Sequence, residues 1–181
     1  VVAASTPAAA TLGWKTWDVT GIVGGWVNGS YANHGMLMDG VGAISTLGFA
    51  SSDNATAANR PRLDVTFLPP CGWVPPLTVV TLPPSADAKI DSANSNKNYG
   101  GSTVIGIKGR TMMGNEIRLL ARFDTSGVAP GTLLQSAIMR FYVASITNNS
   151  NSARTVSAYA VSEAWVEGSK NGGMQTSDGV T

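Results

Sequence analysis

Asp and Asn side chains are concentrated in one short stretch of the chain, residues 87–98. The stretch reads DAKIDSANSNKN and contains Asp87, Asp91, Asn94 and Asn96. Carboxylate and amide oxygens at short spacing on a loop are the hard ligands that Ca²⁺ requires, although this spacing is not that of an EF-hand loop. The pattern therefore predicts a calcium site at these four residues. Because Asp and Asn also cap their own backbone in turns, a purely structural Asx-rich turn is the alternative.

Residue types that perform catalysis are sparse in this chain. His34 is the only histidine, so one chain cannot assemble a histidine-centred triad or a histidine-rich metal site, and we expect a turn or interface residue there. Glu163 and Glu167 flank Trp165, and glycoside hydrolysis uses paired carboxylates. Nothing in the sequence fixes the distance between them, and no nucleophile, base and orienting group can be named together. We therefore expect a protein that is not an enzyme.

The chain has five tryptophans, and an exposed indole can stack its π face on the apolar surface of a sugar ring. Four of them occupy periodic positions that favour the hydrophobic core: Trp14, Trp17, Trp26 and Trp165. A platform of exposed aromatic rings for sugar binding is the alternative that the sequence leaves open.

The fifth tryptophan lies in a proline-rich stretch, where burial of its indole needs a partner surface. The residues predicted to contact a neighbouring subunit are Cys71, Trp73, Pro75 and Pro76. Cys71 is the only cysteine, so it cannot form an internal disulfide. If exposed it would crosslink two chains, and if buried it would be a small apolar residue.

Three N-x-S/T sequons, at Asn28, Asn54 and Asn148, are candidate glycosylation sites in turn-like surroundings. Such triplets also arise by chance in a chain rich in Asn, Ser and Thr. The first residues lack an initiator methionine and a signal-peptide pattern, which favours a processed N-terminus. These features favour a secreted protein that is extracellular or at the cell surface.

Composition excludes several kinds of partner. Only 13% of the residues are charged, and the 12 basic and 11 acidic side chains nearly cancel. No basic run forms an electrostatic footprint for nucleic acid, and no apolar run approaches the roughly 20 residues that a membrane-spanning helix needs. We therefore expect neither nucleic acid binding nor membrane insertion. The abundance of Gly, Ser, Thr, Asn and Val is typical of short β-strands joined by polar turns.

Alternating patterns predict an all-β fold with one short helix. Alternation of apolar and polar residues over 117–125 and 136–145 is typical of half-buried antiparallel strands. Further strands are predicted at 14–19, 34–40, 43–51, 62–68, 87–92, 103–109 and 154–165. The apolar face of 19–27 predicts a helix that ends near Asn28, with Thr20 as its N-cap.

Six prolines separate the strands into two blocks, because repeated proline removes backbone donors and favours extended conformations. We therefore divide the chain into a block at 1–69, a proline-rich linker at 70–84 and a second block at 85–181. Each block holds too few strands for a complete β-sandwich, which usually has seven or more.

The two blocks resemble, in inverted order, parts of one secreted module. DAKIDSANSNKNYGGSTVIGI, RLLARFDTSGVAPGTLLQSAIMRFYV and VSAYAVSEAWVEGS resemble the first two thirds of the DNRLRE domains, which are grouped with carbohydrate-binding modules and related to disaggregatase repeats. GWKTWDVTGIVGGWVNGSYANHGMLMDG, FASSD and RPRLDVTF resemble the last third. The resemblance implies an antiparallel, jelly-roll-like β-sandwich, and a chain that joins the C-terminal part of one module to the N-terminal part of the next.

Two topologies satisfy this arrangement. Residues 1–69 could fold back on residues 85–181 of the same chain, or each block could be completed by strands from a neighbouring subunit. The second arrangement is head-to-tail and generates a filament. The stiff linker favours it, so our leading hypothesis is a structural subunit of an extracellular filament or surface array, with identical subunits as partners. The alternative is a carbohydrate-binding module with polysaccharide as partner.

Overall fold

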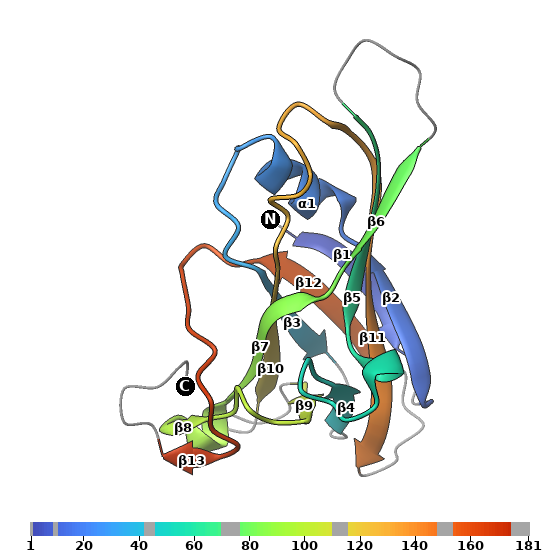
Figure 1. The fold of residues 1–181 in the computed structure, drawn as a ribbon. Coiled ribbons are helices and arrows are strands. Elements are labelled where there is room, and N and C mark those ends of the chain that lie inside the picture. The colour runs from blue at the N-terminus through green and yellow to red at the C-terminus, as the bar shows by residue number, and fades with distance from the viewer. Residues whose placement is uncertain are drawn as a thin grey trace.

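The computed structural model describes residues 2–8, 11–41, 46–69, 77–109, 116–147 and 154–174. These residues form two antiparallel β-sheets and one short α-helix, α1 (Thr20–Val27), which lies at one end of the molecule (Figure 1). The predicted all-β sandwich with a short helix is confirmed. No α-helix within these ranges is long and apolar enough to cross a bilayer.

The first sheet has the strand order β1-β12-β3-β10-β7. Its strands are β1 (Val2–Ala8), β12 (Arg154–Ala160), β3 (Met36–Val41), β10 (Ile117–Phe123) and β7 (Pro84–Asp91). The second sheet has the order β6-β5-β11-β4-β9, with β2 also paired to β11. Its strands are β6 (Thr78–Leu82), β5 (Arg62–Leu68), β11 (Leu133–Thr147), β4 (Thr46–Ala50), β9 (Val104–Ile107) and β2 (Gly13–Asp18).

Short elements complete the described fold. A two-stranded ribbon pairs β8 (Lys97–Asn98) with β13 (Gly173–Met174). Two short 3-10 helices span Ala57–Asn59 and Ser92–Asn94.

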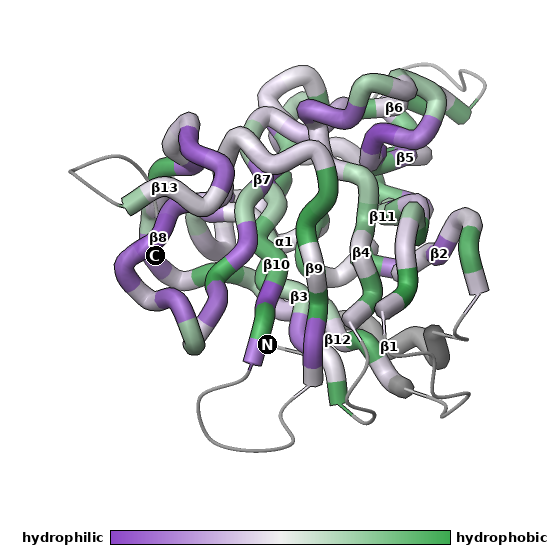
Figure 2. Tube along the Cα trace, turned by 90° about the horizontal axis from the view of Figure 1, so that it is seen from below, coloured by the Kyte–Doolittle hydropathy of each residue, from purple (hydrophilic) through white to green (hydrophobic). Residues whose placement is uncertain are grey.

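The core lies between the two sheets, and the alternating sequence patterns place it there. On β11, Ala137, Met139, Phe141 and Val143 are buried while the residues between them are not, as the alternation predicts. Hydrophobic residues also lie along β4 and β9, whereas the turns beside β8 are hydrophilic (Figure 2). Trp17 is fully buried, and its indole Nε1 donates a hydrogen bond to the Val156 carbonyl in the opposite sheet at 2.8 Å. Its predicted place in the core is correct.

Helix α1 has the predicted bounds but not the predicted cap. Thr20 is the first helical residue, Val19 is the N-cap, and no side chain caps the helix. The Thr20 hydroxyl donates to Asp18 Oδ1 at 2.6 Å and accepts a hydrogen bond from the Ala137 backbone N–H at 2.9 Å. The N-cap prediction was wrong because the hydroxyl joins the helix to β11 instead of closing its first turn.

Several strand predictions need correction. Strand β12 ends at Ala160, so the expected strand over 154–165 is shorter. The part of the predicted linker that is described also differs from a spacer, because Thr78–Leu82 forms β6 and pairs with β5, and β7 begins at Pro84. The β-branched run TVVTL favours a strand, and proline is tolerated at the first position of an edge strand.

The two sequence blocks share both sheets within this one chain. Strand β3 from the first block lies between β12 and β10 from the second, and β11 from the second block pairs with β2, β4 and β5 from the first. The assignment of the blocks to two successive modules stays a prediction.

A segment that we call the strap, residues 161–172, follows β12 and runs outside β7 (Figure 1). Trp165 of the strap packs on Ala86, Ala88 and Leu120, which lie on the outer side of the first sheet. Buried Asn98 fastens the strap, because its Nδ2 donates to the Glu167 carbonyl at 2.8 Å and its Oδ1 accepts from the Lys170 N–H at 3.0 Å. The strap therefore covers part of that outer face.

Candidate functional site

A cleft of about 610 Å³ lies at the α1 end of the sandwich. Its volume is within the range of about 300–1,000 Å³ that is usual for ligand sites. One part of the lining is apolar, with Trp26, Val27, Phe123, Val128 and Pro130. The other part is polar, with Asn33, Ser85, Arg122, Asp124, Thr125 and Ser126. The cleft is therefore amphipathic, with apolar and hydrogen-bonding surfaces facing one space.

The loop after α1 closes one side of the cleft. Asn33 donates from Nδ2 to the Phe123 carbonyl at 2.8 Å and to Thr125 Oγ1 at 3.3 Å. Its Oδ1 accepts from the Gly35 N–H at 3.1 Å. Gly35 has φ +90°, and a Cβ there would lie 2.5 Å from the Ala121 carbonyl oxygen, so the loop approaches β10 too closely for any other residue. Asn33 is thus a positioning residue that holds the loop against β10.

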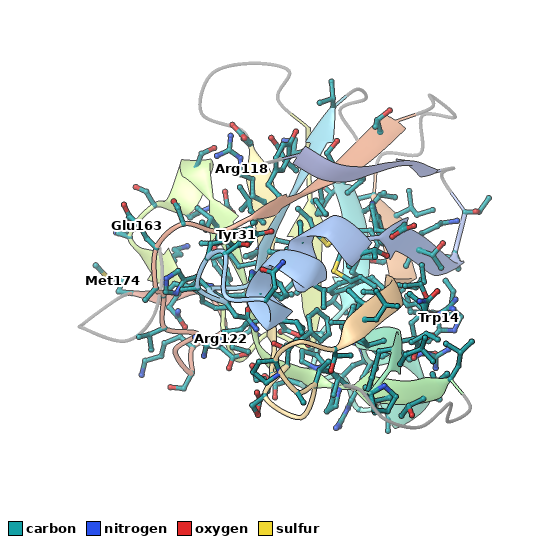
Figure 3. The ribbon with its side chains drawn as sticks, turned by 90° about the horizontal axis from the view of Figure 1, so that it is seen from above. Trp14, Tyr31, Arg118, Arg122, Glu163 and Met174 are labelled. Atoms are coloured by element: carbon teal, nitrogen blue, oxygen red, sulfur yellow. The ribbon has the colours of Figure 1, made fainter. Side chains whose placement is uncertain are left out.

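Arg122 carries the positive charge of the cleft lining. It lies next to the end of β10, and its guanidinium carbon is 5.4 Å from the centre of the Trp165 ring. Nη1 also donates to the Trp165 carbonyl at 3.5 Å, and Trp165 Nε1 donates to the His34 carbonyl at 2.6 Å. Strap and loop therefore fix the direction of the guanidinium. Figure 3 shows Arg122 and Tyr31 on one side of the molecule and Trp14 on the other.

Asp124 carries the negative charge of the cleft lining and is exposed. Its Oδ1 accepts a hydrogen bond from the Ser126 backbone N–H at 2.9 Å. This bond, with a second from the Ser126 side chain, lowers the pKa of Asp124. The carboxylate is therefore ionised at neutral pH, and its other lone pairs remain available to accept hydrogen bonds from a ligand.

Two further carboxylates meet at the edge of β7, outside the cleft. Asp87 is fully buried, its Oδ2 accepts from the Ser52 N–H at 2.6 Å, and its own N–H donates to Glu167 Oε1 at 2.7 Å. Burial, together with the nearby charge of Glu167, raises the pKa of Asp87 to about 7. Burial also raises the pKa of Glu167. Glu163, by contrast, is exposed, so the two glutamates beside Trp165 have different surroundings.

The four residues of the predicted calcium site lie in two places. Asp91 Oδ2 accepts from Asn94 Nδ2 at 3.1 Å, and Asp91 Oδ1 accepts from the Ala93 N–H at 3.1 Å, which is the capping role of the alternative interpretation. Asp87 is four residues away along extended β7, or about 13 Å, and Asn96 is exposed. Among the described residues no group of three or more Asp, Glu, His and Cys could hold a metal ion. Calcium binding stays a prediction.

The other predicted sites are only partly described. Asn28 is exposed at the end of α1, and its Oδ1 accepts from the Ser30 hydroxyl at 2.7 Å. Asn54 is half-buried, and its Nδ2 donates to the Thr103 carbonyl at 3.0 Å. The third sequon, Asn148, and the whole predicted interface lie outside the described residues; that interface is Cys71, Trp73, Pro75 and Pro76.

The outer face of the second sheet carries Trp14, for which the core prediction was wrong. Trp14 lies half-buried on β2, 5.5 Å from Tyr142 between ring centres, and Arg62 lies 4.7 Å over its ring. The reason is the strand period, because Trp17 takes the inward side of β2 and Trp14 points the other way. On the same face Arg140 Nε bonds Asp64 Oδ2 at 2.6 Å. This face is where an exposed aromatic platform for sugar binding, the alternative that the sequence left open, would lie.

Sequence reasoning missed most of the cleft. Trp26 and Trp165 were correctly predicted to be buried, at 7% and 8% exposure, but Arg122, Asp124 and Asn33 were not predicted as site residues. One local signal was present: the polar run DTSG directly after the alternating strand RLLARF, which indicates an Asx-type turn with exposed side chains.

Comparison with known families identifies one match. Residues 78–172 match the sequence model of Carbohydrate-binding module family 96, from β6 through the strap. No curated protein and no solved structure matches the chain. The match favours the carbohydrate-binding hypothesis over the filament hypothesis.

Proposed function

The chain belongs to carbohydrate-binding module family 96, and from this premise we propose that its function is to bind a saccharide in the cleft beside α1. A carbohydrate-binding module is a non-catalytic kind of domain, in agreement with the expectation that the chain is not an enzyme. The observation that carries the proposal is the cleft itself, because Ser85 and the lining residues between Arg122 and Pro130 lie within the matched range.

The chemistry of the cleft suits a sugar. A sugar ring presents hydroxyls around its edge and C–H groups on its faces. The Arg122 guanidinium donates hydrogen bonds in a planar fork, and the Asp124 carboxylate can accept from two hydroxyls at once. The apolar wall, which includes Val128 and Pro130, offers surface to the C–H groups.

The side chains of the cleft are held in fixed positions, which favours ligand binding over catalysis as the function of the cleft. Trp165 holds the guanidinium of Arg122, and Ser126 holds the carboxylate of Asp124. Preorganised side chains lose little conformational freedom when a ligand binds. Secretion follows as part of the proposal, because polysaccharides are met outside the cell.

Two more specific hypotheses from the sequence, the relation to DNRLRE domains and the head-to-tail filament, remain proposals with less support than saccharide binding. The relation to DNRLRE domains and disaggregatase repeats agrees with the family match in class, since both concern carbohydrate-binding modules. The head-to-tail filament has no observation in its favour beyond the proline-rich stretch that suggested it. Saccharide binding is therefore the function that we propose.

The proposal is tested by affinity electrophoresis and pull-down on a panel of soluble and insoluble polysaccharides. Asp124→Ala should weaken binding to any retained polysaccharide by about 10-fold or more, since hydrogen bonds to charged groups contribute about 1.5–3 kcal/mol. Asp18→Ala is the matched control. Asp18 is also exposed and also accepts from a backbone N–H two residues later, but it lies outside the cleft. Retention on none of the panel, or equal effects of both variants, would exclude the cleft as the site.

A further inference from the structure

A second, smaller cavity of about 270 Å³ lies beside the loop that joins α1 to β3. Its lining comes from that loop, from the last residue of β12 and from the first residues of the strap: Tyr31, Ala32, His34, Ala160, Val161 and Ser162. The described lining of the cleft shares none of these residues. The second cavity is therefore distinct from the cleft beside α1.

The order of strands in the first sheet places the two cavities next to each other. Met36, the first residue of β3, pairs with Ala160 of β12 on one side and with Ala121 of β10 on the other. Neighbouring strands lie about 4.8 Å apart, so the ends of β12 and β10 are about 10 Å apart at this edge. The second cavity lies at the end of β12, and the cleft lies at the end of β10, where Arg122 and Phe123 contribute to its lining. The two cavities are therefore adjacent at one edge of the sheet.

The loop before β3 lies between the two cavities. It makes a three-residue turn in which the His34 N–H donates to the Ala32 carbonyl at 3.2 Å, with Asn33 at its centre. Asn33 lines the cleft, whereas Ala32 and His34 line the second cavity. The Val161 N–H donates to the Gly35 carbonyl at 3.0 Å, so the strap begins beside this loop (Figure 1). A saccharide chain that lies in the cleft therefore reaches the second cavity by crossing this turn.

The lining of the second cavity suits a sugar unit. The Tyr31 ring is half-buried and is held in place, because its Oη donates to the Ile22 carbonyl at 3.1 Å. Together with Val161 it offers apolar surface to the C–H groups of a sugar ring. His34 is half-buried and Ser162 is exposed, and the side chains of both have no hydrogen-bond partner among the described residues. Both side chains are therefore accessible and available to the hydroxyls of a sugar.

One strap residue connects the walls of the two cavities. Trp165 Nε1 donates to the His34 carbonyl at 2.6 Å, and the Arg122 guanidinium lies over the Trp165 ring. His34 lines the second cavity and Arg122 lines the cleft. Trp165 therefore holds the two walls in a fixed relation, and a chain that binds across both meets a preorganised surface.

We propose that the second cavity is a subsite for a further unit of the saccharide chain that the cleft binds, so that a chain of several units binds more tightly than one or two units. This proposal rests on the proposed function and deepens it by assigning a second site and a ligand class, an oligosaccharide segment. Tyr31, Ala32 and His34 lie outside residues 78–172, so the family match does not cover this wall of the subsite.

The first test uses the untagged full chain labelled with ¹³C, in which His34 is the only histidine and gives a single imidazole Cε1–Hε1 resonance. Cello-, manno-, xylo- and galacturono-oligosaccharides are titrated as disaccharides and as hexasaccharides. In the series that binds, we expect the hexasaccharide to shift the His34 resonance. We also expect it to bind about 10-fold or more tightly than the disaccharide, because its second contact is intramolecular.

Two double variants separate the second cavity from the rest of the surface. Ala32→Leu with Ser162→Leu narrows the cavity from both walls at exposed positions, where substitutions have little effect on folding. Ala55→Leu with Ser95→Leu makes the same two changes at exposed residues that line neither cavity. We expect the first double variant to lower the affinity for the hexasaccharide to that for the disaccharide, with the disaccharide affinity unchanged. The control should change neither affinity.

The outcomes distinguish the subsite from the proposed function. A hexasaccharide that binds no more tightly than the disaccharide, that leaves the His34 resonance unmoved, or that responds equally to the two double variants would overturn the subsite. Loss of binding in Asp124→Ala would still support the cleft in that case. If no oligosaccharide and no polysaccharide of the panel binds, the proposed function fails and the subsite fails with it.

Discussion

Two Arg–Trp pairs lie on the two outer faces of the sandwich, and their surroundings differ. Arg122 lies over Trp165 under the strap, where the indole is 8% exposed and donates to the His34 carbonyl. Arg62 lies over Trp14 on the second sheet, where the indole is half-buried. The same kind of cation–π contact therefore involves an arginine that lines the cleft in one place, and lies on a partly exposed sheet face in the other. Burial and hydrogen bonding, more than residue type, decide which pair can position a ligand group.

The largest expected difference between the two pairs is in stability. Trp165→Ala should cost about 3–5 kcal/mol of unfolding free energy, because it leaves a cavity under the strap and frees the His34 carbonyl. Trp14→Ala should cost about 1 kcal/mol, since only part of its ring is buried. Urea unfolding curves of both variants measure this difference. Similar losses of unfolding free energy would mean that packing of the strap on the first sheet contributes little to stability.

The buried carboxylate beside the strap should make stability depend on pH. The pKa of Asp87 is about 7 in the folded chain and near 3.8 when unfolded, so between these values the folded state binds more protons. Unfolding free energy should therefore fall as pH rises from about 4 to 7, by at most roughly 4 kcal/mol at 1.36 kcal/mol per pKa unit. Unfolding curves across this range should lose most of that slope in Asp87→Asn. An unchanged slope in the variant would assign it to other groups.

The smallest expected effect concerns the ion pair beside Trp14. Burial raises the pKa of Asp64, but hydrogen bonds from Arg140 and Thr81 outweigh it, so the pKa is lowered overall. Both side chains of the Arg140 pair are partly exposed, at 34% and 20%, so Asp64→Asn should cost less than about 1 kcal/mol. Thermal unfolding at low and high salt checks this, and a cost above 2 kcal/mol would show that the second face is more tightly organised than its exposure indicates.

The sequence predicted the strands better than the site, for a physical reason. Strands such as β5, β10 and β11 can be predicted from the local alternation of apolar and polar residues, because the apolar side chains face the core. The cleft instead depends on residues that are far apart in the sequence. Trp26 and Asn33 come close to Arg122 because β3 pairs with β10 in the first sheet. No local sequence pattern indicates that pairing. Strand β6 was missed because prolines on both sides of it favoured a spacer, whereas pairing with β5 decided its structure.

The buried carboxylate illustrates the same limit. Asp87 was predicted as a calcium ligand from its neighbours in the sequence, whereas its protonation depends on Ser52 and Glu167, which lie far away in the chain. The spacing of Asp and Asn residues alone therefore indicated a calcium loop, while the fold divides those residues between β7 and the turn that follows it.

The most direct test of the central claim compares the two arginines by isothermal titration calorimetry with the polysaccharide that the panel retains. Arg122→Gln and Arg62→Gln each remove a guanidinium that lies over a tryptophan, but only Arg122 lines the cleft. We predict that Arg122→Gln weakens binding about 10-fold or more and that Arg62→Gln leaves it within about 2-fold of the wild type. A loss confined to Arg62→Gln would contradict the account and place the saccharide on the outer face of the second sheet.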